Sequence, residues 1–272
     1  MSLSPLEFNR LIYSFYEKEG RTLPWREDLN PWGILVSEFM LQQTKVQRVE
    51  EYWKRWMKKW PNPADLHNAG LEEVLREWSG LGYNRRCKFL KDCAGIIVRD
   101  YKGKVPGLPE DMIKLPGIGP YTAGAIPCFA YNHASVFIET NIRSVMIRFF
   151  FPGQEGITDK KILPVIDSFL DRSNPRKWYW ALMDYGAALK KTIPNPNRQS
   201  AHYTRQKPFT GSFRQLRGAI MRSLINEGPG KNEDIQKRLG LEPKTADFYD
   251  ALEALKKDSL VAEEGGVYRA GN

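Results

Sequence analysis

The stretch LPGIGPYTAGA at residues 115–125 is the most specific pattern in the chain. Gly117 and Gly119 are spaced by one residue, which permits a tight turn with exposed backbone N–H groups. Pro120 can begin the helix that follows, because its missing N–H costs nothing in a first helical turn. Backbone N–H groups gathered at the start of a helix attract a phosphate. The stretch therefore predicts a phosphate-binding loop, and the alternative is an ordinary turn between two core helices.

Helices are predicted on both sides of this loop. Ser4 and Pro5 form an N-cap and first-turn pair that predicts a helix running to Glu19, and Asn30-Pro31 repeats the pair. The helical spacing of apolar residues continues at about residues 46–59, 71–79 and 84–101, after Pro120, after Glu139 and over about 160–190. We therefore expect an all-α domain over residues 1–190.

The C-terminal part of the chain has a different organisation. Residues 191–212, KTIPNPNRQSAHYTRQKPFTGS, contain three prolines and many polar residues, which predicts a linker or irregular extension over residues 191–210. FRQLRGAIMRSLINEG, NEDIQKRLGL and KTADFYDALEALKKD then predict three short helices. VAEEGGVYRAG predicts a hairpin that turns at Gly265-Gly266. This order is typical of a small winged-helix (α+β) domain, here over residues 211–272.

The composition favours a nucleic-acid partner. The 272 residues are enough for a sizeable core, and 41 Lys and Arg exceed 32 Asp and Glu to give a formal charge of +9. Such an excess favours a polyanion, with nucleic acid ahead of a membrane. Residues 208–272 carry ten basic and ten acidic side chains, so the positive excess belongs to residues 1–207. The neutral C-terminal part is expected to contact either protein or nucleic acid.

The three cysteines, Cys87, Cys93 and Cys128, fit neither a metal-binding motif nor a disulfide framework. Reduced, buried thiols are expected, and with them an intracellular location in the cytoplasm or nucleoid. The N-terminal MSLSPLEFNR lacks the apolar core of a signal peptide, and no run of about 18 apolar residues occurs. We therefore expect no membrane-spanning segment.

LPGIGPYTAGA resembles the hairpin of helix-hairpin-helix DNA-binding proteins, and the chain resembles the helix-hairpin-helix glycosylase superfamily of base-excision repair. Its further motifs are similar, in the same order, to those of adenine DNA glycosylases (MutY-like proteins). These motifs are LPWR (23–26), SEFMLQQTKV (37–46), WSGLGYNRR (78–86), FIETNIRSV (137–145) and ALMDYGA (181–187). The resemblance covers roughly residues 5–190, about two thirds of the chain. It implies an all-α domain of two lobes, with duplex DNA in the cleft between them.

Glu38 lies on one helical face with Ile34, Leu35, Leu41 and Gln42. A carboxylate on this mostly apolar face is partly desolvated, which favours its protonated form and suits a general acid. From the residues alone, a core Glu satisfied by Arg or backbone is the favoured interpretation. The resemblance implies instead that Glu38 protonates an extruded adenine at N7. The glycosidic bond then breaks through an oxocarbenium-like state.

This chain has Glu139-Thr140-Asn141 where the family has Asp-Gly-Asn. A second carboxylate, that of Glu139, therefore stands at the position of the family's Asp. The resemblance implies that Glu139, with Asn141, stabilises the sugar cation or activates water. Glu is one methylene longer than Asp, and a misplacement of about 1 Å can cost much of the rate. Glu also caps a helix less well than Asp, so we expect a poor cap here. The alternative is a first-turn helix residue facing the helix dipole.

Tyr121 stands where lyase-competent relatives, such as endonuclease III, carry the Lys that forms a Schiff base with the sugar. The resemblance therefore implies a glycosylase without lyase activity, in which Tyr121 supports the transition state. The alternative for Tyr121 is packing under the hairpin.

The resemblance also implies which residues contact duplex DNA. Apolar or aromatic side chains are suited to unstacking a base step, and helix-end packing is the alternative for them. The expected DNA-binding residues are Gln42, Gln43, Thr44, Leu81, Tyr83, Gly117, Gly119 and Thr122. Arg26 and Asp184 resemble base-pocket residues, and the alternative is that they pair with each other.

Adenine glycosylases usually carry an iron–sulfur cluster after the motif matched by ALMDYGA. We expect none here, because its four cysteines would fall near Lys190, Asn197, Ser200 and Gln206. His202 lacks partners for another metal, so no metal bound by side chains is expected. The cofactor that the resemblance implies is a monovalent cation held by backbone carbonyls at the hairpin.

Together these features predict a DNA glycosylase that acts as a monomer on double-stranded DNA with a mispaired or damaged base. The favoured substrate is adenine opposite guanine or 8-oxoguanine. Relatives usually have a nudix-like domain that reads 8-oxoguanine, and residues 211–272 are too short for it, so the opposing base and the partner of this domain stay open. The alternatives are excision of hypoxanthine, uracil or thymine in G·T pairs, and a DNA-binding protein with weakened catalysis on the same scaffold.

Overall fold

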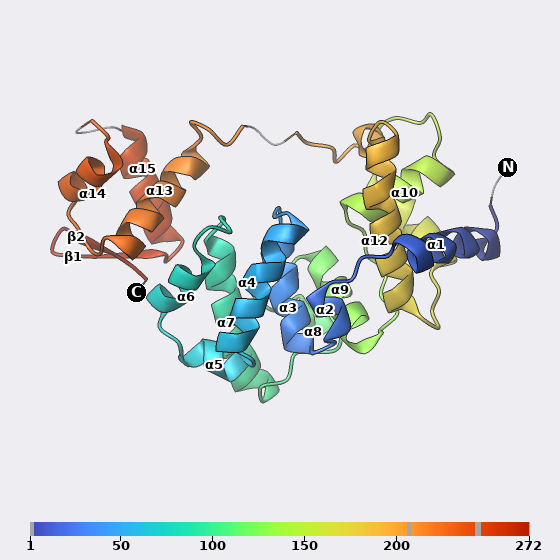
Figure 1. The fold of residues 1–272 in the computed structure, drawn as a ribbon, viewed down its shortest axis with the longest axis horizontal. Coiled ribbons are helices and arrows are strands. Elements are labelled where there is room, and N and C mark those ends of the chain that lie inside the picture. Colours follow the sequence, from blue (N-terminus) through green and yellow to red (C-terminus); the bar gives the residue numbers. More distant parts are fainter. Residues whose placement is uncertain (1–2, 206–207, 243–245, 272) are drawn as a thin grey trace. The chain divides into compact units, whose positions relative to one another are not determined.

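A computed structural model describes residues 3–205, 208–242 and 246–271 of the chain. Most of these residues lie in helices, which confirms the predicted helical class (Figure 1). The chain forms two compact units. The first comprises the residues up to Ile34 and Pro106–Arg205, and the second comprises Leu35–Val105 and the described residues from 208 onward. Among the described helices, none is long and apolar enough to cross a membrane.

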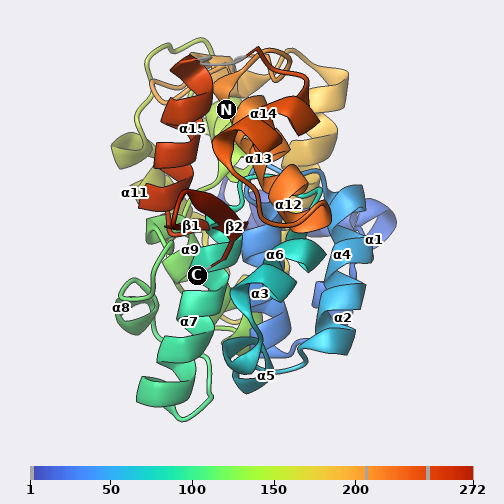
Figure 2. The ribbon, with the colours of Figure 1, turned by 90° about the vertical axis from the view of Figure 1, so that its left-hand side faces the viewer.

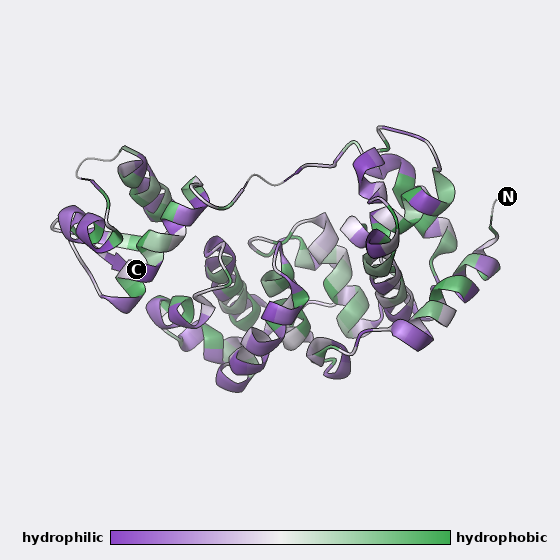
Figure 3. Cartoon of the chain, turned by 45° about the horizontal axis from the view of Figure 1, so that its top comes forward, coloured by the Kyte–Doolittle hydropathy of each residue, from purple (hydrophilic) through white to green (hydrophobic). Residues whose placement is uncertain are grey.

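The first unit consists of helices around an aromatic core. Its elements are α1 (Pro5–Glu19), α2 (Pro24–Glu27), the start of α3 (Pro31–Leu41), α8 (Pro109–Met112), α9 (Pro120–Tyr131), α10 (Thr140–Phe150), α11 (Asp159–Phe169), α12 (Pro175–Thr192) and the 3-10 helix η1 (Pro196–Gln199). Phe8, Trp178 and Tyr179 are fully buried, and the Tyr179 ring stacks on Phe137 with centroids 3.8 Å apart. Single helices carry both apolar and polar residues, as expected for helices with one buried face (Figure 3).

The second unit contains the rest of α3, a group of four helices and a C-terminal α+β segment. Its helices are α4 (Val46–Lys59), α5 (Pro63–Asn68), α6 (Leu71–Trp78), α7 (Arg85–Tyr101), α13 (Phe213–Asn226), α14 (Asn232–Leu239) and α15 (Ala246–Lys257). Strands β1 (Val261–Glu264) and β2 (Val267–Ala270) pair antiparallel, with Val261 opposite Ala270. The predicted three helices and hairpin are therefore present, and α13 contacts both other helices (Figure 2). Gly230 adds a bridge to Tyr268 beside the hairpin.

The predicted helix starts are confirmed in atomic detail. Ser4 caps α1 by accepting from the backbone N–H of Glu7, whose carboxylate accepts in turn from Ser4, so both halves of a capping box are present. Asn30 Oδ1 accepts from the backbone N–H of Trp32 at 3.0 Å at the start of α3. The extension predicted over residues 191–210 is partly helical, because α12 runs to Thr192 and η1 follows it.

Two features of the chain differ from the prediction. The helical stretch expected over residues 160–190 is two helices, because Asn174 caps a new start and Pro175 occupies its first turn. Short helices α2, α5, α8 and η1 were not predicted, although each has Pro in its first turn. The Pro signal at N1 was sufficient to find them, but they are too short to show an apolar period.

Gly186 of α12 lets this helix approach α10, because a Cβ at this position would overlap the backbone oxygen of Asn141. We expect Gly186→Ala to destabilise the protein by about 1–3 kcal/mol, even after the gain in helix propensity of about 1 kcal/mol. Thermal unfolding measures the loss. Gly70→Ala is the control, because no atom lies within 4 Å of its Cβ position. An unchanged melting temperature for Gly186→Ala would contradict the close packing of α10 and α12.

Candidate active site

The predicted phosphate-binding loop joins α8 and α9 in the first unit. Gly117 has φ 76°, in the region that favours glycine, and the backbone N–H of Ile118 donates to Leu115 at 3.3 Å. Gly119 is the N-cap residue of α9, with no atom within 4 Å of its Cβ position. Thr122 is only 4% exposed. No neighbouring atom therefore crowds the backbone at Gly119.

Glu139 is the N-cap residue of α10, and it caps the helix fully. Its Oε1 accepts from the backbone N–H groups of Asn141 at 2.6 Å and Ile142 at 2.8 Å. Its Oε2 accepts from Asn141 Nδ2 at 3.1 Å. The expectation of a poor cap is wrong, because the extended backbone of Glu139 (φ −130°, ψ 178°) lets the longer side chain fold back over the first turn.

Lys190 extends this group toward α12. Its Nζ donates to Asn141 Oδ1 at 2.8 Å, so Asn141 links the ammonium group to the Glu139 carboxylate. Burial raises the pKa of Glu139 above its ordinary value, against the opposing effects of the backbone N–H groups and the charges of Lys190 and Arg143. Burial likewise lowers the pKa of Lys190, and the Glu139 charge opposes that shift. Lys190 was not predicted as a site residue.

Asp184 is the centre of a buried ion-pair group in the first unit. Its carboxylate accepts from Arg26 at 2.8 and 3.0 Å and from the side chain and backbone of Arg21, so the pairing of Arg26 with Asp184 is confirmed. Burial favours the neutral form of Asp184, but the two arginines outweigh it and hold its pKa below the usual range. The Arg26 guanidinium also lies 5.3 Å from the centre of the Trp180 ring. Sequence reasoning missed Arg21.

Tyr121 lies in the first turn of α9, next to the phosphate-binding loop. Its ring is partly buried and meets the Phe137 ring edge-on, with centroids 5.8 Å apart. Phe137 is two residues before Glu139. Tyr121 therefore packs on Phe137, which lies outside the hairpin, and it has no amino group for a Schiff base.

Glu38 belongs to the second unit, in the last two turns of α3. Only 5% of it is exposed, and its neighbours Ser37, Phe39 and Met40 are fully buried. The desolvated position predicted from the helical spacing is confirmed.

Arg86 joins the two loops that were expected to enter the duplex. Its Nη1 donates to the backbone oxygens of Phe39 and Met40 in the last turn of α3 and of Gln42 just after the helix. Its Nη2 donates to Thr44 Oγ1 and to the oxygens of Leu81 and Gly82. Arg86 is 7% exposed, and burial lowers its pKa to about 10. No motif assigned it a role, because its partners Phe39, Met40 and Gln42 are backbone oxygens far away in the sequence.

Gln43 and Tyr83 are the exposed residues at the tips of these two loops. Their φ angles are 56° and 49°, in the left-handed region that residues other than glycine seldom adopt. Tyr83 is 39% exposed, whereas Leu81 is 6% exposed. The loops border a groove of about 580 Å³ lined by Gln43, Thr44, Lys45, Gln47, Arg48 and Leu81. Of these two side chains, that of Tyr83 is accessible at the surface, whereas that of Leu81 is buried.

Polar contacts occupy the region in which the resemblance placed Lys190, Asn197, Ser200 and Gln206 at the cluster positions. Lys190 binds Asn141, Asn197 Nδ2 donates to the Thr140 oxygen at 3.3 Å, and Ser200 forms a parallel bridge with Ile157. Gln206 lies outside the described residues. His202 Nε2 accepts from the backbone N–H of Asp159 at 3.3 Å. The described part of the chain holds no group of three or more His, Cys, Asp or Glu that could bind a metal ion.

The three cysteines are buried, each in the interior of a helix. Burial raises the pKa of each thiol above its ordinary value, so all three stay protonated. The prediction of reduced, buried thiols is confirmed.

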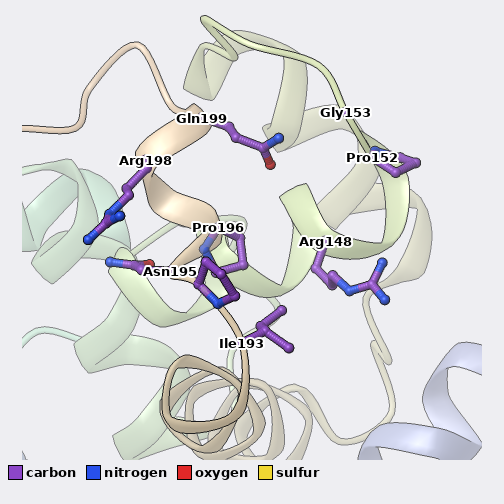
Figure 4. A pocket seen from close by; sticks show the side chains of 9 residues that line it. Arg148, Pro152, Gly153, Ile193, Asn195, Pro196, Arg198 and Gln199 are labelled. Carbon is purple, nitrogen blue, oxygen red and sulfur yellow. The ribbon is translucent and has the colours of Figure 1, made fainter.

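A second pocket, of about 340 Å³, lies between the end of α10 and η1 (Figure 4). Arg148 and Arg198 line it, together with Pro152, Gly153, Gln199 and residues 193–196. None of the predicted site residues contributes to it. The pocket therefore shares no lining residue with the predicted site.

The family is identified by comparison with known proteins. The family model described as "HhH-GPD superfamily base excision DNA repair protein" matches residues 36–167. An adenine DNA glycosylase of Mycobacterium tuberculosis is 46% identical over 276 residues, which cover 92% of this chain and 88% of that protein. The chain belongs to this superfamily, in its adenine DNA glycosylase family. It is thus a DNA glycosylase, as its motifs predicted.

Further relatives agree with this assignment. An adenine DNA glycosylase of Mycolicibacterium smegmatis is 41% identical over 192 residues, 70% of this chain and 64% of that protein, so the match spans less than two thirds of that relative. A thermostable thymine-DNA glycosylase has a TM-score of 0.61 and 25% identity over 67% of this chain and 86% of its own. Endonuclease III in a trapped covalent complex with DNA has a TM-score of 0.60 and 18% identity over 76% of this chain and 91% of its own, which supports the fold alone.

The raised pKa of Glu139 predicts a pH dependence of stability. The folded protein holds this proton at a pH where the unfolded chain has released it, so stability falls as the pH rises past the ordinary Glu pKa of about 4.3. Glu139→Gln cannot ionise. We therefore expect wild-type protein to lose melting temperature relative to Glu139→Gln as the pH rises from about 4 to about 7. Glu51→Gln, at an exposed position of α4, controls for the loss of one charge. A wild type that instead gains relative stability over this range would contradict the raised pKa.

The hydrogen bonds of Arg86 predict a large stability effect. Both Arg86→Met and Arg86→Lys leave buried carbonyl oxygens without donors, because Lys lacks the planar fork of a guanidinium. We expect each to cost about 3 kcal/mol or more in chemical unfolding. Arg85→Met is the matched control, because the side chain of Arg85 is 61% exposed and its pair with Asp258 is 3.4 Å long. Equal, small losses at both positions would show that Arg86 does not hold the loops.

Proposed function

We propose that this glycosylase hydrolyses the N-glycosidic bond of adenine flipped out of duplex DNA, opposite guanine or 8-oxoguanine, without lyase activity. The observation that carries the proposal is the Glu139 carboxylate, held by two backbone N–H groups and Asn141 at the start of α10. A carboxylate fixed in this way can stabilise a cationic sugar without reorganising during the reaction. The names of the relatives support adenine as the base.

In the proposed mechanism Glu38 is the general acid. Its buried position favours the protonated form, and proton transfer to N7 turns adenine into a neutral leaving group. Glu139 then stabilises the oxocarbenium-like sugar until water adds to it. Tyr121 next to the hairpin leaves no amine to form a Schiff base, so the reaction stops at the abasic site.

In the same proposal, the hairpin and the two loops of the second unit contact the DNA. The backbone at Gly117 and Gly119 holds a phosphate, and a monovalent cation can share this loop through backbone carbonyls. The exposed Gln43 and Tyr83 enter the base stack, while Gln42 and Thr44 support the opposite strand. Arg26 and Asp184 shape the base pocket as a pair rather than as separate contacts.

We further propose that the chain is organised into three parts. Residues 1–190 form the catalytic domain, residues 191–210 form an extension that needs no iron–sulfur cluster, and residues 211–272 form a winged-helix domain. The bridge between Gly230 and Tyr268 supports the last assignment, because a winged helix adds a short strand beside its hairpin. The enzyme acts as a monomer inside the cell, where its DNA substrate is found.

Thymine in a G·T pair is the second candidate substrate. The thymine-DNA glycosylase with a TM-score of 0.61 supports it, because the same scaffold there accepts a pyrimidine. The longer Glu139 side chain gives a physical reason for a changed substrate, since it moves the carboxylate relative to the Asp of the family.

A single-turnover excision assay tests both candidates. Labelled duplexes with A·G, A·8-oxoguanine, A·C, G·T, G·U and hypoxanthine pairs are treated with alkali to reveal abasic sites. We expect adenine release from the first two, with no strand cleavage before alkali. Glu38→Gln should lower the rate by at least about 100-fold while DNA binding is retained. Glu51→Gln, exposed on α4, is the matched control and should react at the wild-type rate.

Each other outcome changes the conclusion in a defined way. Release of thymine alone would move the substrate to the G·T pair and keep the roles of Glu38 and Glu139. Tight DNA binding without release from any duplex would leave a binding protein and remove the catalytic proposal.

A further inference from the structure

We propose that the C-terminal segment, residues 213–270, takes part in base extrusion, with Arg214 as the residue that positions Tyr83. The proposal rests on the proposed function, in which the Tyr83 ring enters the duplex beside the extruded base. It gives this segment a task that neither the family match at residues 36–167 nor the catalytic residues account for.

Arg214 lies directly against the exposed tip of the loop. Its Nη1 donates to the Tyr83 Oη at 2.5 Å, and its guanidinium carbon lies 5.9 Å from the centre of the Tyr83 ring. The two residues are 131 positions apart in the sequence and lie in the same compact unit. Arg86 lies 5.5 Å from the same ring centre. Two guanidinium groups from different parts of the chain therefore contact one exposed ring.

The C-terminal segment is docked around this loop rather than touching it at one point. The loop runs from the end of α6 at Trp78 to the start of α7 at Arg85, and α13 and β2 both pack against α6. Asp258, after α15, accepts from Arg217 of α13 at 2.6 Å and pairs with Arg85 at 3.4 Å. Arg217 is three residues after Arg214, so it is on the same face of α13. The ion-pair group therefore holds the α13 face on which Arg214 lies beside the loop.

Arg214 adds to the local support of Tyr83. The residue is 39% exposed, and its φ of 49° is a conformation that costs free energy for a side chain other than glycine. The side chains of Trp78 and Arg86 donate to the backbone oxygen of Gly82 and hold the main chain of the loop. A ring that is already held when DNA arrives loses less conformational freedom on insertion.

The test is a double-mutant cycle on base extrusion. Tyr83→Phe keeps the ring and removes only the hydroxyl acceptor, and Arg214→Ala removes the donor. Extrusion is followed by stopped-flow fluorescence of 2-aminopurine next to the target adenine, within the first turnover. We expect each single variant to slow extrusion about three- to tenfold, and the double variant to be no slower than either one. Arg214→Lys should recover part of the rate, because it keeps a charged donor.

Controls separate this proposal from the one on which it rests. Arg222→Ala changes another, exposed arginine of α13 and should extrude at the wild-type rate. Tyr83→Ala at the wild-type rate would overturn the wedge role of Tyr83 and with it this proposal, whereas excision of adenine by Glu38 and Glu139 would still stand. A slow Tyr83→Ala with a wild-type Tyr83→Phe, or single effects that add in the double variant, would overturn only the role of Arg214. Equal melting temperatures for Tyr83→Phe and wild type exclude a folding effect.

Discussion

The buried guanidinium of Arg86 is the constraint on which the arrangement of the second unit depends. The carbonyl groups at the end of α3 have no partners within the helix, and Arg86 supplies donors to those of Phe39 and Met40 and to that of Gln42 after the helix. The same side chain binds the oxygens of Leu81 and Gly82, so one residue holds two loops in a common geometry. Burial lowers the pKa of Arg86 to about 10, but the guanidinium remains protonated at neutral pH and keeps its donors.

In the first unit, side-chain hydrogen bonds join α12 and the extension after it to the start of α10. Asn197 of the extension binds the backbone of Thr140, and Lys190 of α12 binds Asn141. Each such hydrogen bond adds only modestly to stability, but the bond from Lys190 also orients the Asn141 amide beside the Glu139 carboxylate. The packing of α12 on α10 therefore shapes the surroundings of Glu139.

Much of the fold could be predicted from the sequence, because capping pairs and apolar periods act locally. Ser4-Pro5 and Asn30-Pro31 specified helix starts, and the spacing around Glu38 specified its burial. The break between α11 and α12 was not predicted, although residues 171–174 are polar and Asn174-Pro175 repeats the pair that begins α1 and α3. Arg21, Arg86 and Lys190 were not predicted because their partners lie far away in the sequence. A long-range hydrogen bond leaves no motif.

The two oxygens of the Glu139 carboxylate have different surroundings. Oε1 accepts from two backbone N–H groups, so its lone pairs are occupied by the helix cap. Among the residues that the structure describes, Oε2 accepts from Asn141 Nδ2 alone. Lys190 binds the other end of the Asn141 amide and so fixes which way it faces. In the proposed mechanism, one oxygen of this carboxylate therefore serves the helix cap, and the other is available to the sugar cation.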